Sequence, residues 1–227
     1  CEDARATLID GAWYVTYTSV SRFGITPSLA VTRDFKTFDK RGVILGPDNK
    51  DIALFPYLRD GQFTALTRPM PSAFGHVLGI WLAYPDRGRP WGGRKPLVMP
   101  RRGFWDERHT GASAVPFACR GGWLEIYHGV DADLRYSLGA VLLDRDDPGT
   151  VLARSPEPIL APETPYERSG LLDNVVYACG HVPLDADGRR IRVYYGAGDS
   201  VIAAADFDVG EILDSLARVS RRPAGTS

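Results

Sequence analysis

The sequence predicts an all-β protein of the β-propeller class. Short segments rich in aromatic and β-branched residues recur along the 227 residues, and Gly, Pro and Asp clusters separate them. These segments repeat in one order: a turn glycine, an aromatic strand, a strand of small residues and an aspartate. Helical periodicity is almost absent until Val209 to Ala217. Units of roughly 50 to 65 residues with about four short strands are typical of propeller blades.

The strands follow the repeat in order along the chain. Each aromatic strand begins just after a turn glycine, and each small-residue strand ends near an aspartate, except in the second unit, which is a variant of this pattern. The expected strands are Trp13 to Thr18 and Ser28 to Thr32, Gln62 to Thr67 and Val77 to Ala83, Trp123 to Tyr127 and Ser137 to Leu143, and Ile191 to Tyr195 and Val201 to Ala205.

A β-sandwich is the competing architecture for a chain of many short strands. A sandwich does not ordinarily repeat the order aromatic strand, small-residue strand, Asp, so the repeat favours a propeller. Propellers bind ligands at one mouth of a central channel, where residues far apart in the sequence meet.

Composition narrows the function classes. With 44% hydrophobic residues the chain can bury one good core, which predicts a single domain over residues 1–227. The net charge of -1 argues against nucleic acid as a partner, because proteins that follow phosphate backbones usually carry a basic excess. No apolar stretch approaches the ~20 residues that span a bilayer, so no membrane association is expected.

The cysteines and histidines predict neither a disulfide framework nor a metal site. Cys1, Cys119 and Cys179 are an odd number at wide spacing, which is typical of reduced thiols and favours the cytoplasm. The four histidines lack ligand spacing, and no Gly-rich nucleotide-binding loop occurs.

Seven motifs in order resemble those of glycoside hydrolase family 130, the β-mannoside phosphorylases and related β-mannosidases. The match runs along nearly the whole chain, and the motifs are Glu2-Asp3-Ala4-Arg5, Asn49-Lys50-Asp51 with Ala53-Leu54-Phe55-Pro56, Thr67-Arg68-Pro69, Trp123 to Val130, Pro156 to Leu160, Asn174-Val175-Val176 and Tyr194 to Asp199.

The resemblance implies a five-bladed β-propeller, of which about four blades are present, because the N-terminal part is lacking. It also implies an enzyme that cleaves β-mannosides with inorganic phosphate as co-substrate and needs no other cofactor. Family members often assemble, so a homo-oligomer is expected as well.

The resemblance assigns the proton donor to Asp3. Phosphate is already an anion, so a phosphorylase needs a single acid and no base. In the family this acid is thought to deliver its proton through a hydroxyl of the mannosyl residue. We expect Asp3 to lie in a closed pocket, with Glu2 repelling its charge. Arg5 is expected to pair either with Asp3 or with the Glu2 carboxylate, and Glu2 and Arg5 are both assigned to substrate binding.

The same resemblance assigns phosphate binding to Lys50, Arg68, His109 and His128. Lys and Arg suit phosphate by charge and by forked hydrogen bonds. A solvated loop lysine and a core histidine bonded to the backbone are the alternatives for Lys50 and His128.

Two positions depart from the family pattern. His109 stands where phosphorylases tend to carry Lys, and a neutral imidazole anchors a dianion less strongly. A degraded phosphate site with Asp106 or Glu107 activating water would give an inverting hydrolase instead. Asp173 stands where the family often has Pro, and its carboxylate is a candidate for binding sugar hydroxyls or for a second base.

Two further residues are candidates for sugar binding. The resemblance places Asp199 on the mannosyl hydroxyls, and an ordinary turn aspartate is the alternative. Trp105 could stack on a sugar ring, although an aromatic side chain in a propeller is more often part of a blade core.

The sequence therefore predicts an inverting β-mannoside phosphorylase that releases α-mannose 1-phosphate. A β-mannosidase on the same scaffold and a non-catalytic glycan-binding propeller are the alternatives. The linkage and the acceptor sugar are left open.

Overall fold

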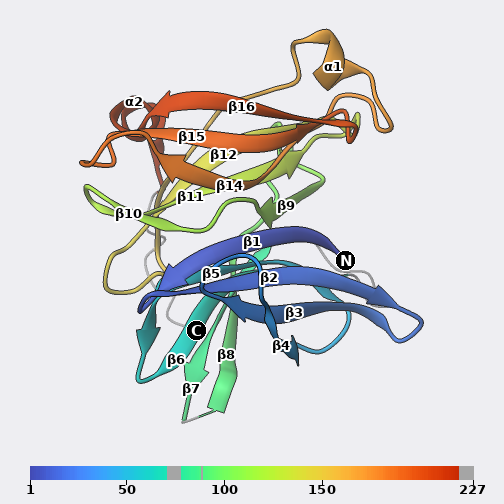
Figure 1. Cartoon of the computed structure of the whole chain (residues 1–227). Coiled ribbons are helices and arrows are strands. Elements are labelled where there is room, and N and C mark those ends of the chain that lie inside the picture. The colour runs from blue at the N-terminus through green and yellow to red at the C-terminus, as the bar shows by residue number, and fades with distance from the viewer. Residues whose placement is uncertain (71–77, 88, 220–227) are drawn as a thin grey trace, which may run out of the picture.

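The computed structural model describes residues 1–70, 78–87 and 89–219, and its strands form four antiparallel sheets. The first two sheets have four strands each (Figure 1). Sheet one contains β1 (Glu2–Ile9), β2 (Ala12–Ser21), β3 (Gly24–Thr32) and β4 (Asp39–Val43), and sheet two contains β5 (Asn49–Arg59), β6 (Gln62–Pro69), β7 (Ile80–Asp86) and β8 (Arg89–Val98).

The third and fourth sheets come from the second half of the chain. In sheet three, β9 and β10 pair with opposite ends of the same edge of β11, so together they form an interrupted inner strand. Sheet three contains β9 (His109–Ala112), β10 (Phe117–Cys119), β11 (Gly122–Val130), β12 (Tyr136–Leu143), β13 (Val151–Arg154) and β17 (Ala217–Arg218), and sheet four contains β14 (Val176–Pro183), β15 (Arg190–Ala197) and β16 (Val201–Asp208).

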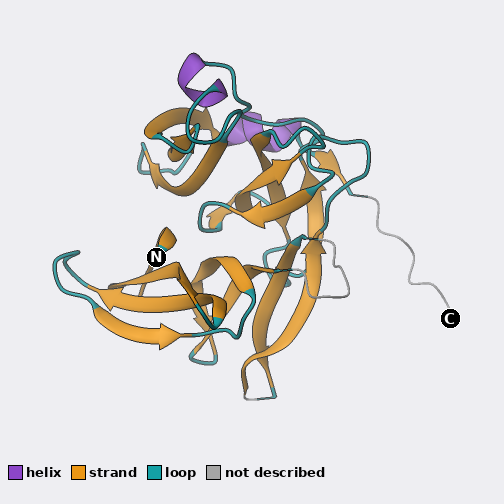
Figure 2. Cartoon of the chain, turned by 90° about the vertical axis from the view of Figure 1, so that its right-hand side faces the viewer, coloured by secondary structure: helices purple, strands orange, loops and turns teal. Residues whose placement is uncertain are grey.

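The sheets follow one another along an arc, which Figure 2 shows from the side. Strand β1 contacts both β5 and β14, so the first strands of sheets one, two and four lie next to one another although they are far apart in the sequence. The four sheets thus have the arrangement of propeller blades and not the two facing layers of a sandwich.

Tight turns link the first two strands in each of the first two sheets. Asp10 and Gly11 have φ of 48° and 74°, and Asp60 and Gly61 have φ of 51° and 72°. Positive φ at both central residues is the geometry of the type I′ hairpin turn, for which Asp-Gly is a favoured sequence. These dipeptides therefore fix the register of β1 with β2 and of β5 with β6.

The hydrophobic core lies between successive sheets. Leu29 and Ile52 belong to the cluster between sheets one and two, Phe55 and Tyr127 to the next, and Leu124 with Val193 to the third. Side chains of a strand alternate between its two faces, so each central sheet contributes to two clusters. Among the described residues no helix is long and apolar enough to cross a membrane.

Seven of the eight expected strand regions lie within strands of the structure. The eighth, Val77 to Ala83, is a strand only from Ile80 onward in β7: Val77 lies outside the described residues, Leu78 forms an isolated bridge with His109, and Gly79 is not in a strand. The expected C-terminal helix is α2 (Val209–Ser215), which Asp208 caps by accepting hydrogen bonds from the backbone N–H groups of Gly210 and Glu211. A second short helix, α1 (Pro165–Arg168), precedes β14.

Candidate functional site

Two aspartates occupy corresponding bulges in the first strands of sheets one and two. The register of β1 with β2 shifts between Glu2 and Arg5, and that of β5 with β6 shifts between Lys50 and Ala53. Asp3 and Asp51 lie inside these bulges with φ of 56° and 54°, a region that Asp tolerates better than most residues. A bulge re-aims a side chain, and these two bring both carboxylates into one cluster.

Asp51 is the centre of this cluster and has no solvent exposure. Its Oδ2 lies 2.6 Å from Arg68 Nε and 3.7 Å from His128 Nε2, and its Oδ1 lies 3.9 Å from a terminal nitrogen of Arg5. Although burial alone raises the pKa of the Asp51 carboxyl, the Arg68 guanidinium holds it well below its usual range. Asp51 is therefore an anion that fixes the cations around it.

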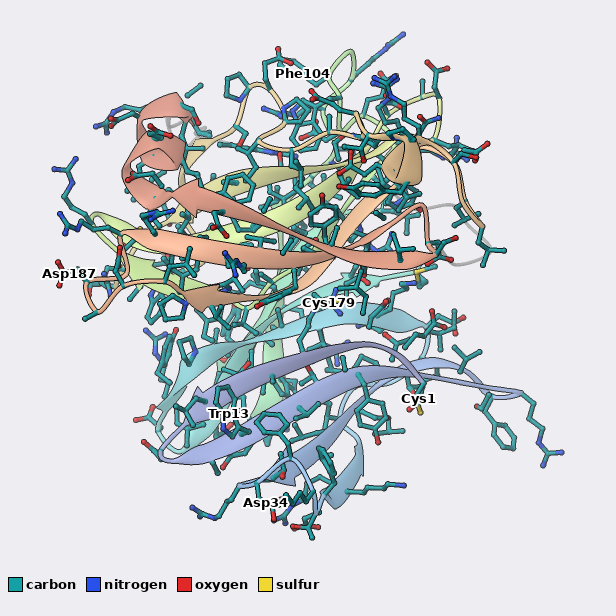
Figure 3. The ribbon with its side chains drawn as sticks, turned by 45° about the horizontal axis from the view of Figure 1, so that its top comes forward. Cys1, Trp13, Asp34, Phe104, Cys179 and Asp187 are labelled. Carbon is teal, nitrogen blue, oxygen red and sulfur yellow. The ribbon has the colours of Figure 1, made fainter. Side chains whose placement is uncertain are left out.

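Arg5 is a buried organising residue. Its guanidinium donates to the carbonyls of Asp3, Ala112 and Ser113 at 2.7, 2.8 and 2.7 Å, and to the Tyr177 hydroxyl at 3.0 Å. The side chain thus joins sheets one, three and four and pairs with neither the Glu2 nor the Asp3 carboxylate. Cys179, which marks this part of β14 in Figure 3, lies on the same strand as Tyr177.

The Asp3 carboxylate faces this cluster at its edge. Its Oδ2 lies 3.8 Å from Lys50 Nζ and accepts a hydrogen bond of 3.3 Å from the Tyr177 hydroxyl. The Asp3 side chain is 19% exposed, so the pocket is only partly closed. Glu2 is exposed, and with Asp3 it also lines an open hollow of about 500 Å³.

The two histidines lie on adjacent strands of sheet three. His109 begins β9 and His128 lies in β11, with ring centroids 6.0 Å apart. Burial, and after it nearby Arg68, lower the pKa of His109 to about 4. Burial also lowers the pKa of His128 well below its usual range. Both rings are neutral at pH 7, and each Nε2 is buried without a hydrogen-bond partner.

Ser113 supports His128 from behind. Its hydroxyl lies 3.1 Å from His128 Nδ1, and its backbone N–H donates to the buried Glu125 carboxyl at 3.1 Å. Burial raises the pKa of Glu125 well above its usual range, which favours the neutral form of this side chain. The other ring nitrogen of His128, Nε2, therefore points toward Asp51 at the centre of the cluster.

Tyr136 connects this cluster to sheet four. Its ring stacks on His128 at 6.0 Å and contacts the edge of His109 at 5.5 Å. Asp199, in the turn between β15 and β16, is exposed and acts on the pKa of Tyr136 as one of several nearby charges. Asp173 is also exposed, and its carboxylate accepts from the Gly170 backbone N–H at 3.3 Å.

Trp105 does not join the cluster. Its ring stacks on Tyr127 with centroids 5.5 Å apart and lies against Gly129 and Gly139, where an added Cβ would collide with it. Tyr127 and His128 are neighbours in β11 and point to opposite faces of the strand. Trp105 therefore packs within sheet three, and its position does not support the sugar-stacking prediction.

Asp106 cannot serve as the water-activating base of the hydrolase alternative. It is fully buried, and its carboxylate accepts from Arg101 at 3.1 and 2.8 Å, from Arg154 at 2.7 Å and from the Tyr127 hydroxyl at 2.8 Å. Glu107 accepts from the Gly103 backbone N–H at 2.8 Å. Both carboxylates hold the loop before β9 in place.

Sequence reasoning missed the residues that organise the site. Asp51 stands inside the quoted Asn49-Lys50-Asp51 motif without an assigned role, and Tyr177 directly follows the Asn174-Val175-Val176 motif. Proximity to a motif was their only signal, because their roles depend on contacts across sheets. Ser113 and Tyr136 carried no such signal.

The arrangement suits an anion held beside a carboxyl group. Lys50 and Arg68 supply positive charge, and neutral His109 and His128 supply ring nitrogens that lack partners. Asp3 lies at the edge of this polar cluster, where a carboxyl can transfer a proton. Among the described residues, no group of three or more His, Cys, Asp or Glu side chains could hold a metal ion.

Comparison with known proteins agrees with this geometry. The sequence profile of glycoside hydrolase family 130, described as beta-1,4-mannooligosaccharide phosphorylase, matches residues 1–218. The chain is 39% identical over 215 residues to a beta-1,2-mannobiose phosphorylase of Listeria innocua, covering 95% of the chain and 59% of that protein. It is 37% identical over 214 residues to a 1,2-beta-oligomannan phosphorylase of Thermoanaerobacter sp., covering 93% of the chain and 69% of that protein.

A solved structure gives the same result. The beta-1,2-mannobiose phosphorylase of Listeria innocua in complex with beta-1,2-mannobiose superimposes with a TM-score of 0.88 at 38% identity, covering 94% of this chain and 60% of that one. The chain thus spans about 60% of the length of this relative. With a profile that matches nearly its whole length, the chain belongs to glycoside hydrolase family 130.

Proposed function

We propose that the protein is an inverting β-mannoside phosphorylase that cleaves a β-linked mannosyl sugar with inorganic phosphate and releases α-mannose 1-phosphate. The observation that carries the proposal is the buried cluster of Arg68, His109 and His128 around Asp51. Arg68 supplies a full charge there, and the unpartnered Nε2 atoms of both histidines supply hydrogen-bonding capacity. A buried cluster with one guanidinium and two ring nitrogens that lack partners fits a phosphate group.

In the proposed reaction, a phosphate oxygen attacks the anomeric carbon of the mannosyl residue from the face opposite the leaving sugar. The C1–O bond to the leaving sugar breaks as the C1–O bond to phosphate forms, which inverts the β configuration to α. Asp3 supplies the proton that the leaving oxygen needs, through a hydroxyl of the mannosyl residue as the family resemblance implies. Phosphate brings its own negative charge, so the reaction needs no base.

We propose His109 as a phosphate-binding donor in spite of its difference from the lysine expected at this position. Its low pKa, which results from burial and from Arg68, leaves the ring neutral, so it contributes a hydrogen bond and no charge. Lys50 and Arg68 then carry the positive charge. Glu2, Arg5, Asp173 and Asp199 remain proposed for the sugar side of the site, Arg5 through the carbonyls that it fixes.

A β-1,2 linkage is the substrate that we favour. The relatives named for β-1,2-linked mannosides are 36% to 39% identical to the chain, and the one named for β-1,4-linked oligosaccharides is 31% identical. The contacts of the Asp106 carboxylate count against this residue as the base of the hydrolase alternative, and Glu107 stays the other candidate base in that loop.

For the whole protein we propose five blades in one propeller domain. Val15, Tyr17 and Ala30 line the open hollow on one face of sheet one, and Ile202 of β16, on the face away from Ala203 and the core, is 85% exposed. A further sheet packed against these faces would bury their apolar area. A cytoplasmic location and assembly into a homo-oligomer remain predictions.

The proposal is tested by incubating the protein with β-1,2-mannobiose in the presence and absence of inorganic phosphate. Mannose 1-phosphate and mannose are expected in equal amounts, and only when phosphate is present. Release of free mannose alone, at the same rate without phosphate, would contradict the proposal and favour the hydrolase.

A further inference from the structure

We propose that the Tyr177 hydroxyl positions the Asp3 carboxyl and couples its protonation state to the buried cluster centred on Asp51. The inference rests on the proposed function, because it concerns the group that donates the proton in that reaction. Tyr177 lies near the start of β14, in a different sheet from both Asp3 and Asp51. Its hydroxyl therefore links three sheets at one point.

The hydroxyl has one proton and two carboxylate acceptors. It lies 3.0 Å from Asp51 Oδ1 and 3.3 Å from Asp3 Oδ2, and its oxygen accepts from Arg5 at 3.0 Å. Burial, together with the Asp51 charge, raises the pKa of Tyr177 well above its usual range, so the proton stays on the phenol oxygen. Tyr177 can therefore donate to only one of the two carboxylates at a time.

The choice between the two acceptors depends on Asp3. A protonated Asp3 does not require a donor, so the Tyr177 proton goes to the ionised Asp51. Once Asp3 has given up its proton, its carboxylate competes for the same hydrogen bond. A donor to the charged form of an acid favours that form, so Tyr177 stabilises Asp3 after proton transfer and holds its Oδ2 in place.

Several other groups act on Asp3, and all of them remain when the hydroxyl is removed. Lys50 Nζ lies 3.8 Å away on β5, Arg5 binds the Asp3 carbonyl, and Glu2 is the neighbouring exposed carboxylate. Further charged or titratable neighbours are Asp51, Lys40 in the hollow that Asp3 lines, and Cys179 on β14, where burial raises the pKa of the thiol to about 11, so that it is neutral. Removing the Tyr177 hydroxyl therefore leaves these groups in place and takes away only its own contacts, with Asp3, Asp51 and Arg5.

Tyr177→Phe makes this change and keeps the aromatic ring, which lies 4.7 Å from the His128 ring. The matched control is Tyr195→Phe, since the Tyr195 hydroxyl is also buried and donates to a carboxylate, Glu167 Oε1, at 2.6 Å, away from the cluster. Both variants remove a tyrosine hydroxyl that donates to a carboxylate. Tyr177→Phe in addition removes the acceptor of Arg5 and the contact with Asp3.

The first measurement is the pH profile of phosphorolysis with β-1,2-mannobiose. Tyr177→Phe is expected to lower kcat by roughly 10- to 100-fold, the loss of one charged hydrogen bond, with both KM values within about two-fold of the unchanged protein. The alkaline limb of its profile is expected to move to higher pH by about half a unit or more. Tyr195→Phe should show neither change.

The second measurement does not depend on turnover. Carboxyl ¹³C NMR of Asp3, assigned by comparison with Asp3→Asn, gives the midpoint of its titration in each protein. The midpoint should be higher in Tyr177→Phe than in the unchanged protein and the control. An unchanged midpoint, or a Tyr177→Phe variant in which only the KM for phosphate rises, would overturn the inference.

These outcomes separate the inference from the function on which it rests. Phosphate-independent release of mannose by the unchanged protein would overturn the proposed function, and the NMR midpoints would still decide the role of Tyr177. Normal phosphorolysis with equal midpoints would overturn the role of Tyr177 alone.

Discussion

At the scale of single residues, Asp51 determines how the site is assembled. Its buried carboxylate holds Arg68, faces His128 and accepts from Tyr177, so the cations of the cluster have fixed places before any ligand arrives. A preorganised site loses little energy to rearrangement when phosphate binds. Asp3 sits at the edge of this assembly, where Lys50 and Tyr177 are the partners of its carboxylate among the residues that the structure describes.

Asp3→Asn removes the ionisable proton and keeps the side-chain shape. We expect kcat for phosphorolysis to fall by at least about 100-fold, because general acid catalysis typically contributes that much or more. Steady-state kinetics measure the loss, and Asp39→Asn is the control because Asp39 is exposed and pairs only with Arg41 at 2.7 Å. Activity of Asp3→Asn within two-fold of the unchanged protein would remove Asp3 from its proposed role.

His109 predicts a pH dependence of stability. Its pKa in the folded state is about 4, below the ordinary value of 6.5, so between these values the unfolded chain binds more protons than the folded one. Stability therefore decreases as the pH falls from 6.5 toward 4, by on the order of 1 to 2 kcal/mol at pH 5 from this residue. His128 acts in the same direction. The low pKa of Asp51 contributes stability at higher pH, and this contribution is lost only as the pH falls below the ordinary value of 3.8.

Urea unfolding at pH 7, 6 and 5 measures this effect. The free energy of unfolding should fall with pH in the unchanged protein and fall less steeply in His109→Asn, which has no ionisable ring. Parallel pH dependences in the two proteins would show that His109 is not buried in a neutral form.

Sequence reasoning at this scale found the charged residues and missed their organisers. Lys50, Arg68, His109 and His128 were expected together from the family resemblance, and the structure brings them to one cluster. Arg5 was expected on the substrate side, yet its guanidinium donates to backbone carbonyls. That role depends on which carbonyls converge from other sheets, and a sequence does not contain this information.

At the scale of strands, bulges and glycines create the space that the cluster needs. Gly111 lies in β9, and a Cβ added there would collide with Asp51 Oδ2 and with the His128 ring. The collision cannot be relieved cheaply, because both neighbours are fully buried and hydrogen-bonded or paired.

Gly111→Ala should therefore displace Asp51 or His128. We expect kcat/KM for phosphate to fall by roughly ten-fold or more, and the free energy of unfolding to fall by about 1 to 3 kcal/mol, the usual cost of overpacking. Gly180→Ala is the control, because no atom lies within 4 Å of an added Cβ at this position of β14. Equal behaviour of the two variants would contradict the close packing around Gly111.

Asp106 gives a second prediction at this scale. Asp106→Asn leaves the buried Arg154 and the partly buried Arg101 without their anion, so we expect a loss of about 3 to 5 kcal/mol in the free energy of unfolding. Asp133→Asn, at an exposed position, should be nearly neutral. Stability of Asp106→Asn equal to that of the control would free Asp106 for the catalytic role that the structure denies it.

The strands that the sequence predicted are those with strong aromatic or small-residue patterns. The strands that were missed include the short or polar β4, β9, β10 and β17, and also the longer β1, β5 and β14, which carry Asp3, Asp51 and Tyr177. β4 is exposed throughout and β17 has two residues, so their pairing partners and not their own composition make them strands. β9, which carries His109 and Gly111, has only four residues, too few to show a strand pattern in the sequence.

At the scale of the whole molecule, the propeller arrangement is what brings the site together. All four sheets contribute to the site, which lies where their inner strands converge. The contributing residues are 3, 50, 68, 109, 128 and 177. The repeated strand unit predicted this architecture, and the ordered motifs predicted the family. The assignment of the fifth blade rests on the resemblance, because four sheets are all that the described residues form.

The central claim is that phosphate binds between Lys50, Arg68 and His128 beside Asp3. A crystal structure of the protein soaked with inorganic phosphate and mannose tests it most directly. We predict phosphate within hydrogen-bonding distance of Arg68 and His128 and mannose against Asp3, with its anomeric carbon facing the phosphate. Mannose bound against Asp3 with only water in the cluster, at phosphate concentrations that saturate turnover, would contradict the account.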